Sequence, residues 1–502
     1  MAFEKLPNFR LILSTVSISA LCIFPDGYHL GVVNIPQTIL ENFVNESTYA
    51  HYGTVLTSSH LSLLWAFIAN VYMIGGIVGA WSTMFLAEHY GRKYSLLVIN
   101  NMVSILASLL MGLSKIANSM EMLTIGRFIV GVNSGLATGL LGMYLTECSP
   151  VKFRGVTASF VNLFITMTTL ISQIVALPQL LGTEELWPLL LALSAIPSVI
   201  QLATFWMFPE SPKHLLLTAK NELKARESIK YFHGEKADME EVLDEFRKEQ
   251  ELAKEELSLR EALSDFDLWW PIFMSAVINI AQIATGITAV FTYSTDIFMS
   301  VGVSESEAPL FSMITSIFNL SGAFIALPLI DRFGRRPLML LGLIACIVCD
   351  IVFMAFSLVS QYDRSLAWPS YVSLVAIMIH VTVFNIGPGP IAWFISSEST
   401  PHSVRSIGAS VSITVNWISG LVCGLIYLPL QEAVGAWSFL LFIIPTAICT
   451  VFLWWKMPET KNRTIDEIMK TWSRKQNWGD ARIAYSPEMQ FRNGLVVKDD
   501  EC

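Results

Sequence analysis

The segment ECSPVKFR, residues 147–154, sets the organisation of the chain because its marked positions return 251 residues later (398 − 147 = 251). Glu147-x-x-Pro150-x-x-x-Arg154 recurs as Glu398-x-x-Pro401-x-x-x-Arg405, and two further motifs recur in the same order. These are Gly91-Arg92-Lys93 with Gly334-Arg335-Arg336 (334 − 91 = 243), and Pro209-Glu210-Ser211 with Pro458-Glu459-Thr460 (458 − 209 = 249). Three motifs in one order at nearly one spacing indicate two like halves that face each other across a pseudo-two-fold axis.

The composition places the chain in a membrane. Hydrophobic residues make up 53% of the 502 positions, charged residues make up 15%, and the mean hydropathy is +0.54. A soluble protein of this length needs more polar surface, so these values indicate a protein that crosses the bilayer several times. The net charge of −9 gives no indication of a nucleic-acid partner.

Twelve apolar windows are long enough to cross the hydrocarbon core as helices, six on each side of a charged segment. They lie near residues 9–31, 63–88, 95–113, 120–146, 156–178, 185–207, 269–295, 308–330, 337–360, 369–397, 406–428 and 433–455. We therefore predict an all-α membrane protein with two six-helix bundles. The predicted parts are an N-terminal bundle (1–208), a cytoplasmic helical linker (209–268), a C-terminal bundle (269–455) and a cytoplasmic tail (456–502).

The distribution of basic residues orients the predicted spans. The predicted exterior loops contain only Lys115 and Arg364, whereas the loops on the other side, the linker and the tail are basic. Since cytoplasmic loops are the ones enriched in Lys and Arg, both termini are expected in the cytoplasm. Asn45, in the sequon Asn45-Glu46-Ser47 of the first exterior loop, is expected to carry a glycan.

The segment between the bundles differs sharply in composition, since 26 of the 60 residues from 209 to 268 are charged. Amphipathic helices are expected at 222–231 and 239–252. They form either a solvated linker or a helical cap that latches the two bundles in one state.

Nothing in the sequence predicts a metal or a cofactor. Cys346 and Cys349 form a single CxxC inside an apolar window, without a second pair of ligands. We interpret them as small helix residues rather than as zinc ligands.

Several motifs together resemble those of the sugar porters of the major facilitator superfamily, most closely the facilitative glucose transporters of animals. The likeness extends from about Leu11 to Ile468. The resemblance implies a major facilitator fold and sugar transport. The matching motifs are Gly27-Tyr28-x-x-Gly31-Val32-x-Asn34-x-Pro36-Gln37, Gly126-Arg127-Phe128, Pro209-Glu210-Ser211-Pro212, Asp331-Arg332-Phe333-Gly334-Arg335-Arg336, Gly387-Pro388-Gly389-Pro390-Ile391-x-Trp393 and Pro458-Glu459-Thr460-Lys461.

The charged motif residues at the cytoplasmic ends of the spans are candidates for a gate, as they are in that family. Ionised groups at these ends avoid the cost of full burial. Pairs formed across the two halves would hold the cytoplasmic side closed, and splitting them would favour inward opening. The positive-inside rule alone explains the arginines, but not two glutamates placed alike in both halves. The candidates are Arg92, Glu147, Arg154, Arg335, Arg336, Glu398 and Arg405.

A sugar needs neutral amides and hydroxyls as partners for its own hydroxyls, and an aromatic plane for its apolar faces. The resemblance implies that both halves supply such groups, although any single amide could instead bond a neighbouring helix. The candidates from the second half are Gln282, Thr288, Asn319, Asn385, Trp393, Asn416 and Trp417, and those from the first half are Asn162 and Gln173.

The chain departs from the family pattern at several of these positions. Asparagine replaces the usual glutamine at Asn162 and a common glutamate at Asn385. Ile283 and Thr288 replace a glutamine and an asparagine, and Asn279-Ile280-Ala281 replaces the Gln-Leu-Ser of glucose-preferring members. Each lost hydrogen bond is worth about 0.5–1.5 kcal/mol, so several could change the preference among hexoses. Glucose, fructose, another monosaccharide and a less hydroxylated solute all stay open as substrates.

Ionisable residues in the interior of predicted spans are candidates for proton coupling. In proton-coupled sugar porters an aspartate takes the position of His29 and pairs with the arginine at Arg127, whereas uniporters usually have asparagine. His29, close to Asp26, could carry a proton or act as a neutral substitute for that asparagine. Asp350 and His380 have no clear partner in the sequence.

The sequence thus favours a facilitative hexose uniporter that works by alternating access in the plasma membrane, with its monosaccharide and the bilayer as partners. The alternatives are a proton-coupled symporter using His29, Asp26 and Arg127, or a non-transporting sugar sensor, which would normally have a longer tail. An enzyme is not expected, because the polar segments contain no phosphate-binding glycine loop, metal cluster or nucleophile–base arrangement. The oligomeric state is left open.

Overall fold

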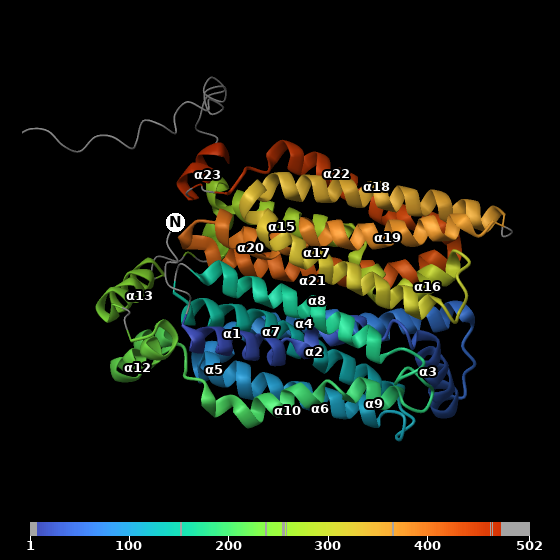
Figure 1. Ribbon diagram of the computed structural model, residues 1–502, viewed down its shortest axis with the longest axis horizontal. Coiled ribbons are helices and arrows are strands. Elements are labelled where there is room, and N and C mark those ends of the chain that lie inside the picture. Colours follow the sequence, from blue (N-terminus) through green and yellow to red (C-terminus); the bar gives the residue numbers. More distant parts are fainter. Residues whose placement is uncertain are drawn as a thin grey trace, which may run out of the picture.

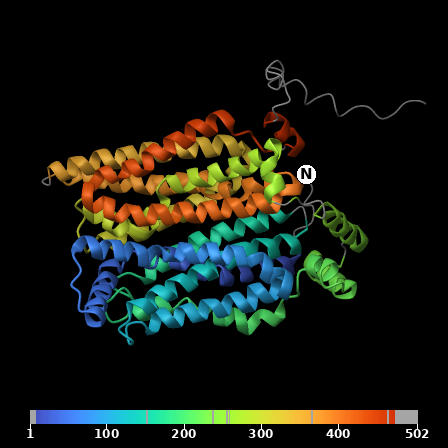
Figure 2. The ribbon, with the colours of Figure 1, turned by 180° about the vertical axis from the view of Figure 1, so that it is seen from behind.

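The computed structural model describes residues 8–150, 153–235, 238–253, 257, 259–363, 366–461, 463 and 465–472. Within these ranges every regular element is a helix. Most helices run along the long axis of the molecule and form two groups that lie side by side (Figures 1 and 2). This arrangement confirms the predicted all-α fold with two bundles.

The first bundle and the helices that follow it occupy the first half of the chain. The bundle contains α1 (Phe9–Cys22), α2 (Phe24–Gly31), α3 (Gln37–Tyr52), α4 (Ser58–Tyr90), α5 (Arg92–Tyr94), a π-helical turn (Ser95–Ile99), α6 (Asn100–Leu113), α7 (Met120–Cys148), α8 (Arg154–Val175), α9 (Trp187–Ala192) and α10 (Ala195–Thr204). Four short helices follow: α11 (Pro212–Leu217), α12 (Glu222–His233), α13 (Met239–Ala253) and α14 (Leu259–Ser264).

The second bundle repeats this pattern of long apolar helices and ends in a short amphipathic one. It contains α15 (Phe266–Ala284), α16 (Ile287–Ser300), α17 (Ala308–Phe333), α18 (Arg335–Tyr362), α19 (Trp368–Ile386), α20 (Pro388–Ser399), α21 (Arg405–Val434), α22 (Leu440–Lys456) and α23 (Ile465–Trp472).

The twelve predicted spans all correspond to helices. Ten stretches of the described helices are long and apolar enough to cross a membrane. One of them, Arg405–Lys456, contains both α21 and α22 and therefore covers two predicted spans. The span predicted at 156–178 corresponds to α8, of which Phe160–Val175 forms a shorter apolar helix.

Four predicted spans are broken where continuous helices were expected, two in each bundle. In the first bundle the 9–31 span divides into α1 and α2 at Ile23, and the 185–207 span divides into α9 and α10. The 269–295 span divides into α15 and α16 at Gly286, which has a φ of +83°. A Cβ at this glycine would lie 2.6 Å from the Phe442 ring, so both the backbone conformation and the close packing require glycine. The 369–397 span divides at Gly387, because Pro388 disfavours helical geometry in the residue before it.

Two helix pairs join the bundles along their length, α4 with α21 and α8 with α17. The helices α12, α13 and α23 lie at one end of the molecule, which we call the linker end, and α3 lies at the opposite end, the α3 end (Figure 1). Towards the α3 end the Asn34 amide donates to Ser294 Oγ at 2.6 Å, and the Asn70 amide donates to Tyr293 Oη at 2.8 Å. These bonds cross from one bundle to the other and hold the α3 end closed.

The break at Gly286 generates a stability prediction. Gly286→Ala forces an alanine into positive φ against an aromatic ring, so we expect a loss of roughly 1–3 kcal/mol. Gly142→Ala is the matched control, because its added Cβ meets nothing within 4 Å. Thermal unfolding of the purified protein in detergent should show a lower Tm for Gly286→Ala and an unchanged or higher Tm for Gly142→Ala. Equal Tm values for both variants would contradict this account of the break.

Candidate functional site

An uncharged group of three amides lies at the end of α15, one turn before the Gly286 break. The Gln282 side chain donates from Nε2 to the Gly389 carbonyl at 2.7 Å, and its Oε1 accepts from Asn416 Nδ2 at 2.6 Å. Asn416 Nδ2 also lies 3.1 Å from Asn279 Oδ1, to which it donates. All three side chains are buried. These amide groups link α15, α20 and α21, and we call Gln282, Asn279 and Asn416 the amide cluster.

A second amide pair joins α17 to α19. Asn385 Nδ2 donates to Asn319 Oδ1, and both side chains are buried. Asn385 stands one residue before Ile386, where α19 ends, so it flanks the break at Gly387. The position at which related sequences often carry a glutamate is thus part of a neutral pair in this chain.

In the first bundle, Gln173 lies on α8 and donates from Nε2 to the Gly31 carbonyl at 3.1 Å. Its Oε1 accepts from Asn34 Nδ2 at 3.5 Å, and the same Asn34 nitrogen reaches Ser294 in the other bundle. Asn162, eleven positions earlier on α8 (173 − 162 = 11), is half-buried. Gln173 is therefore part of the contact between bundles, whereas Asn162 lies further along α8.

The two tryptophans differ in accessibility. Trp393 on α20 is 42% exposed and offers an aromatic face. Trp417 on α21 is buried, with its ring edge-on to Tyr72 at 5.5 Å and packed against Gly76 of α4. Trp417 thus fills the contact between bundles, and only Trp393 offers a free stacking surface. Thr288 is buried in α16, with its Oγ1 close to Gly420 of α21.

Two ionisable residues of the first bundle, Asp26 and Arg127, contact Tyr72. The Tyr72 hydroxyl donates to Asp26 Oδ1 at 2.7 Å, and the Arg127 guanidinium lies 5.3 Å from the Tyr72 ring centroid. Arg127 donates to the His29 carbonyl at 3.1 Å and to the Ala69 carbonyl at 2.6 Å. Arg127 is therefore neutralised mainly by backbone dipoles and the tyrosine ring, and Asp26 is stabilised by a phenol.

Each of the remaining ionisable residues in the spans has a close neighbour. The His29 Nε2 lies 2.8 Å from Ser194 Oγ, and His29 is fully buried. His380 Nδ1 lies 3.0 Å from Asp350 Oδ1, and both residues are buried. The sequence suggests no clear partner for Asp350 or His380. The structure corrects this expectation, because α18 packs against α19 and brings the two side chains together.

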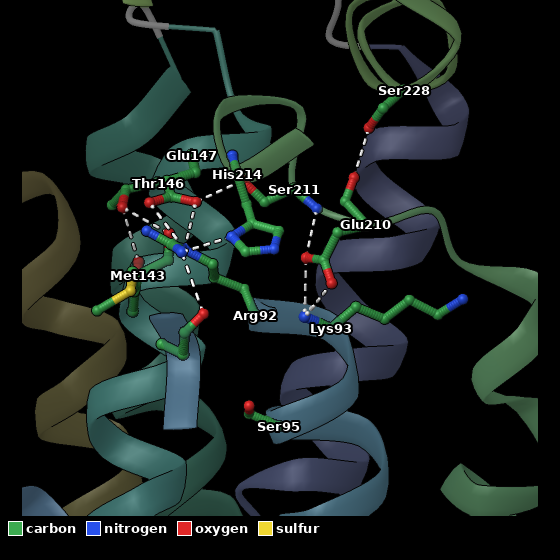
Figure 3. Close-up of polar contacts among 12 residues, drawn as sticks. Arg92, Lys93, Ser95, Met143, Thr146, Glu147, Glu210, Ser211, His214 and Ser228 are labelled. Carbon is green, nitrogen blue, oxygen red and sulfur yellow. Dashed lines mark hydrogen bonds and ion pairs between the residues drawn. The ribbon is translucent and has the colours of Figure 1, made fainter. Parts of the chain in front are cut away.

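The repeated motifs form one compact unit at the linker end of each bundle. Figure 3 shows the first copy, in which the Glu210 carboxylate accepts from the Lys93 backbone N–H at 2.9 and 3.1 Å. Arg92 Nε lies 3.2 Å from Glu147 Oε2, and the Ser211 hydroxyl donates to the same carboxylate. Gly91 begins the turn with a φ of +88°, and a Cβ there would lie 2.5 Å from Glu210 Oε2.

The second copy has the same geometry. Glu459 accepts from the Arg335 and Arg336 backbone N–H groups at 2.9 and 3.1 Å, and Arg335 Nη2 lies 2.8 Å from Glu398 Oε1. Thr460 replaces Ser211 and donates to Glu398 at 2.7 Å. The three repeated motifs therefore meet because a carboxylate caps the backbone that follows a positive-φ glycine.

The other gate candidates lie around these units. Arg336 donates to the Trp454 carbonyl at 2.7 Å, and Arg405 is half-buried at the start of α21. The side chain of Arg154 lies outside the described residues. The Arg92–Glu147 and Arg335–Glu398 ion pairs each form within one bundle, so pairing across the bundles stays a prediction for a state closed at the linker end.

Residues that join the bundles near the α3 end were not among the predicted site residues. Asn34 stood in a quoted motif without a role, and its Oδ1 also accepts from the Thr295 backbone N–H at 3.0 Å. The sequence gives no indication that Asn70 and Tyr293 join the bundles, since they are only polar residues in apolar windows. Asn279 was noted only as a departure from the family pattern.

His214 distinguishes the first linker-end unit from the second. Its Nδ1 lies 2.7 Å from Arg92 Nη1 (Figure 3). Burial, and then the Arg92 charge, lower the pKa of His214 to about 4. Burial raises the pKa of Glu210 in the same unit, although the backbone N–H groups oppose this shift. His214 is therefore neutral at pH 7 and accepts a hydrogen bond from the arginine.

This lowered pKa gives a pH-dependent stability with a defined sign. The unfolded histidine takes up a proton near pH 6.5, whereas the folded one does so only near pH 4, so stability is lost as the pH falls between these values. Replacing His214→Asn keeps an acceptor but removes the titrating group. We expect a smaller fall in Tm from pH 7 to pH 4.5 than in the parent protein. An identical pH profile for the two would rule out the role given to His214.

Comparison with known proteins places the chain in a family. The model of the family described as "Sugar (and other) transporter" matches residues 15–472. The chain is similar to the solute carrier family 2, facilitated glucose transporter member 3 of Ovis aries, at 35% identity over 97% of this chain and 98% of that protein. It is 36% identical to member 1 of the same family from Gallus gallus, over 88% and 89% of the two chains.

Solved structures show the same fold. The inward-open xylose transporter XylE from E. coli superposes with a TM-score of 0.75 at 20% identity, covering 92% of this chain and all of that one. A second XylE structure, titled as a proton:xylose symporter bound to 6-bromo-6-deoxy-D-glucose, gives a TM-score of 0.74. With this fold and with sequence identity above a third along nearly its full length, the chain belongs to the sugar transporter family of the major facilitator superfamily.

Proposed function

We propose that this protein is a facilitative carrier of a hexose such as glucose or fructose, which works by alternating access between its two bundles. The observation that supports this most directly is the amide cluster. A hexose is uncharged, so its site needs neutral donors and acceptors, and Gln282, Asn416 and Asn279 supply them without a formal charge. The relatives named as facilitated glucose transporters support the same function.

The proposed site extends from the amide cluster to the exposed face of Trp393, on which a sugar ring can stack. We propose that the Asn319–Asn385 pair, Thr288 and Trp417 contribute to the same site from the second bundle, and that Gln173 and Asn162 contribute from the first. Because side chains near the α3 end hold that end closed, the linker end is the route by which a sugar reaches the cluster in this state. Rocking of the bundles would break the α3-end bonds and let Arg92, Glu147, Arg335 and Glu398 pair across the linker end.

We further propose that the linker end faces the cytoplasm and that the protein resides in the plasma membrane. The excess of basic residues at this end supports the orientation. Asn45 lies on α3 at the opposite, exterior end and is half-buried there. The chain would then divide into bundles at 1–208 and 269–455, a cytoplasmic linker at 209–268 and a cytoplasmic tail at 456–502, of which residues 473–502 lie outside the described residues.

Proton-coupled symport is the second candidate, because Asp26 and Arg127 both contact Tyr72, Arg127 also contacts the His29 backbone, and a structural neighbour is titled a proton:xylose symporter. Against it, Arg127 makes its hydrogen bonds to backbone carbonyls rather than to Asp26. Uptake by proteoliposomes separates the two. Facilitative transport predicts that a protonophore leaves the initial uptake rate unchanged and that sugar causes no alkalinisation outside. A proton flux that follows the sugar would establish symport instead.

The amide cluster generates a mutational prediction. Gln282→Ala removes two hydrogen-bonding groups worth about 0.5–1.5 kcal/mol each, so hexose uptake should fall about 10-fold. Gln361→Ala is the control, since this glutamine is exposed at the end of α18. Uptake is compared at equal surface expression in cells that lack other hexose carriers. Unchanged uptake by Gln282→Ala would remove Gln282 from the proposed site.

A further inference from the structure

Three carboxylates gather where the two bundles meet at the α3 end. Gln37 Nε2 on α3 donates to Glu41 Oε1 at 2.8 Å and to Asp296 Oδ2 of α16 at 2.7 Å. The two acceptor oxygens are therefore at most 5.5 Å apart (2.8 + 2.7 = 5.5). Beside them, Ser62 of α4 donates to Glu432 of α21. The Gln37–Asp296 and Ser62–Glu432 bonds cross from the first bundle to the second. These carboxylates therefore come together only while the α3 end is closed.

The groups around these carboxylates do not compensate their charge. Glu41 interacts electrostatically with Asp296, Glu432 and Tyr293, and Asp296 interacts with Glu432 and Tyr427, so the charged neighbours among the described residues are acids. Titratable groups on the helices packed against α3 have other partners. On α7, Glu121 contacts His51 and Tyr52, and Arg127 donates to the His29 and Ala69 carbonyls. On α4, His60 contacts Thr57. Like charges held this close oppose closure of the α3 end whenever they are ionised.

The amide that joins the two acids is itself incompletely satisfied. Gln37 is 3% exposed, and its Oε1 is a buried acceptor that has no hydrogen-bond partner among the described residues. Its nitrogen lies between two carboxylates, which accept but cannot donate when ionised. A protonated carboxyl carries the O–H that this oxygen lacks. The closed arrangement thus has a place for a proton, and burial together with the neighbouring acids raises the pKa of Glu41 to about 7.

We propose that Gln37, Glu41, Asp296 and Glu432 form a proton-sensitive latch: protonation of the carboxyls stabilises closure of the α3 end, and their ionisation favours its opening. We call these four residues the acid latch. That the latch senses exterior pH rests on the orientation in the proposed function, but the coupling of pH to opening does not. A proton acts here as a regulator of the conformational equilibrium and is not carried with the sugar.

The sign of the effect follows from the closed-state pKa. Opening separates Glu41 from Asp296 and returns Glu41 to water, which lowers the pKa of Glu41 towards that of a free side chain. The open state therefore gains relative to the closed state as the pH rises. With a closed-state pKa of about 7 for Glu41, linkage predicts that the open-to-closed ratio rises about 10-fold or more between pH 5.5 and pH 8.5.

The test measures opening directly, without sugar. Spin labels at Val55→Cys and Glu305→Cys, both exposed and near the α3 ends of different bundles, report the distance across the latch by pulsed electron resonance in nanodiscs. The other cysteines are replaced by serine. We expect the long-distance population to grow from pH 5.5 to pH 8.5. Glu41→Gln with Asp296→Asn, which keeps the shape and removes both charges, should stay at short distances at both pH values.

Glu46→Gln is the matched control, because Glu46 is an exposed carboxylate on the same helix and should leave the pH response unchanged. A pH-independent distance in the parent, or an unchanged response in Glu41→Gln with Asp296→Asn or in Glu41→Gln alone, would overturn the latch. Hexose flux is measured on the same samples without labels. A pH-dependent distance in a protein that moves no hexose would support the latch while refuting the proposed function.

Discussion

Polar groups in the middle of a membrane protein must bond to each other, because the hydrocarbon around them offers no partner. Gln282, Asn416 and Asn279 meet this demand by bonding one another and the Gly389 backbone. A sugar that enters must exchange these bonds for its own, so each gain is offset by a loss. A net value of about 0.5–1.5 kcal/mol for each exchanged hydrogen bond keeps binding weak enough for release. Under the proposed function, the amide cluster both holds the helices together and binds the sugar transiently.

The two ends of the molecule use different chemistry. At the linker end, each bundle pairs its own arginine with its own glutamate. Glu210 and Glu459 accept from the backbone N–H groups that follow Gly91 and Gly334. Near the α3 end, hydrogen bonds from Asn34, Asn70 and Gln37 cross between the bundles. A change of state must therefore break hydrogen bonds between the bundles at one end and rearrange ion pairs at the other. Because interactions lost at one end are offset by interactions gained at the other, the two conformations can have similar free energies.

The recurrence of like units at the linker end of both bundles could be predicted from the sequence, because their short motifs recur in order and spacing, but their pairing within each bundle could not. The carboxylate of Glu459 caps the turn at Gly334 just as Glu210 caps the turn at Gly91, so the repeat in the sequence is a repeat in geometry. The twelve spans were predictable from hydropathy, since a helix of about 20 apolar residues is needed to cross the bilayer.

Side-chain partners across helices could not be predicted, because hydropathy does not give the rotation of a helix about its axis. Asp350 and His380 lie on separate helices and meet only after α18 packs on α19. Trp417, expected as a stacking surface, instead packs against Tyr72 between the bundles. The break at Gly286 depends on the Phe442 ring of another helix, which no local pattern indicates.

The central claim is that a neutral amide site, reached from one end at a time, moves a hexose across the bilayer. Counterflow in proteoliposomes that contain only this protein tests it most directly. Vesicles loaded with an unlabelled hexose, glucose or fructose, should transiently accumulate the same sugar in labelled form above its equilibrium level. This follows because the labelled and unlabelled molecules exchange through one alternating site. Absence of an overshoot with every hexose tried, in vesicles shown to contain folded protein, would contradict the account.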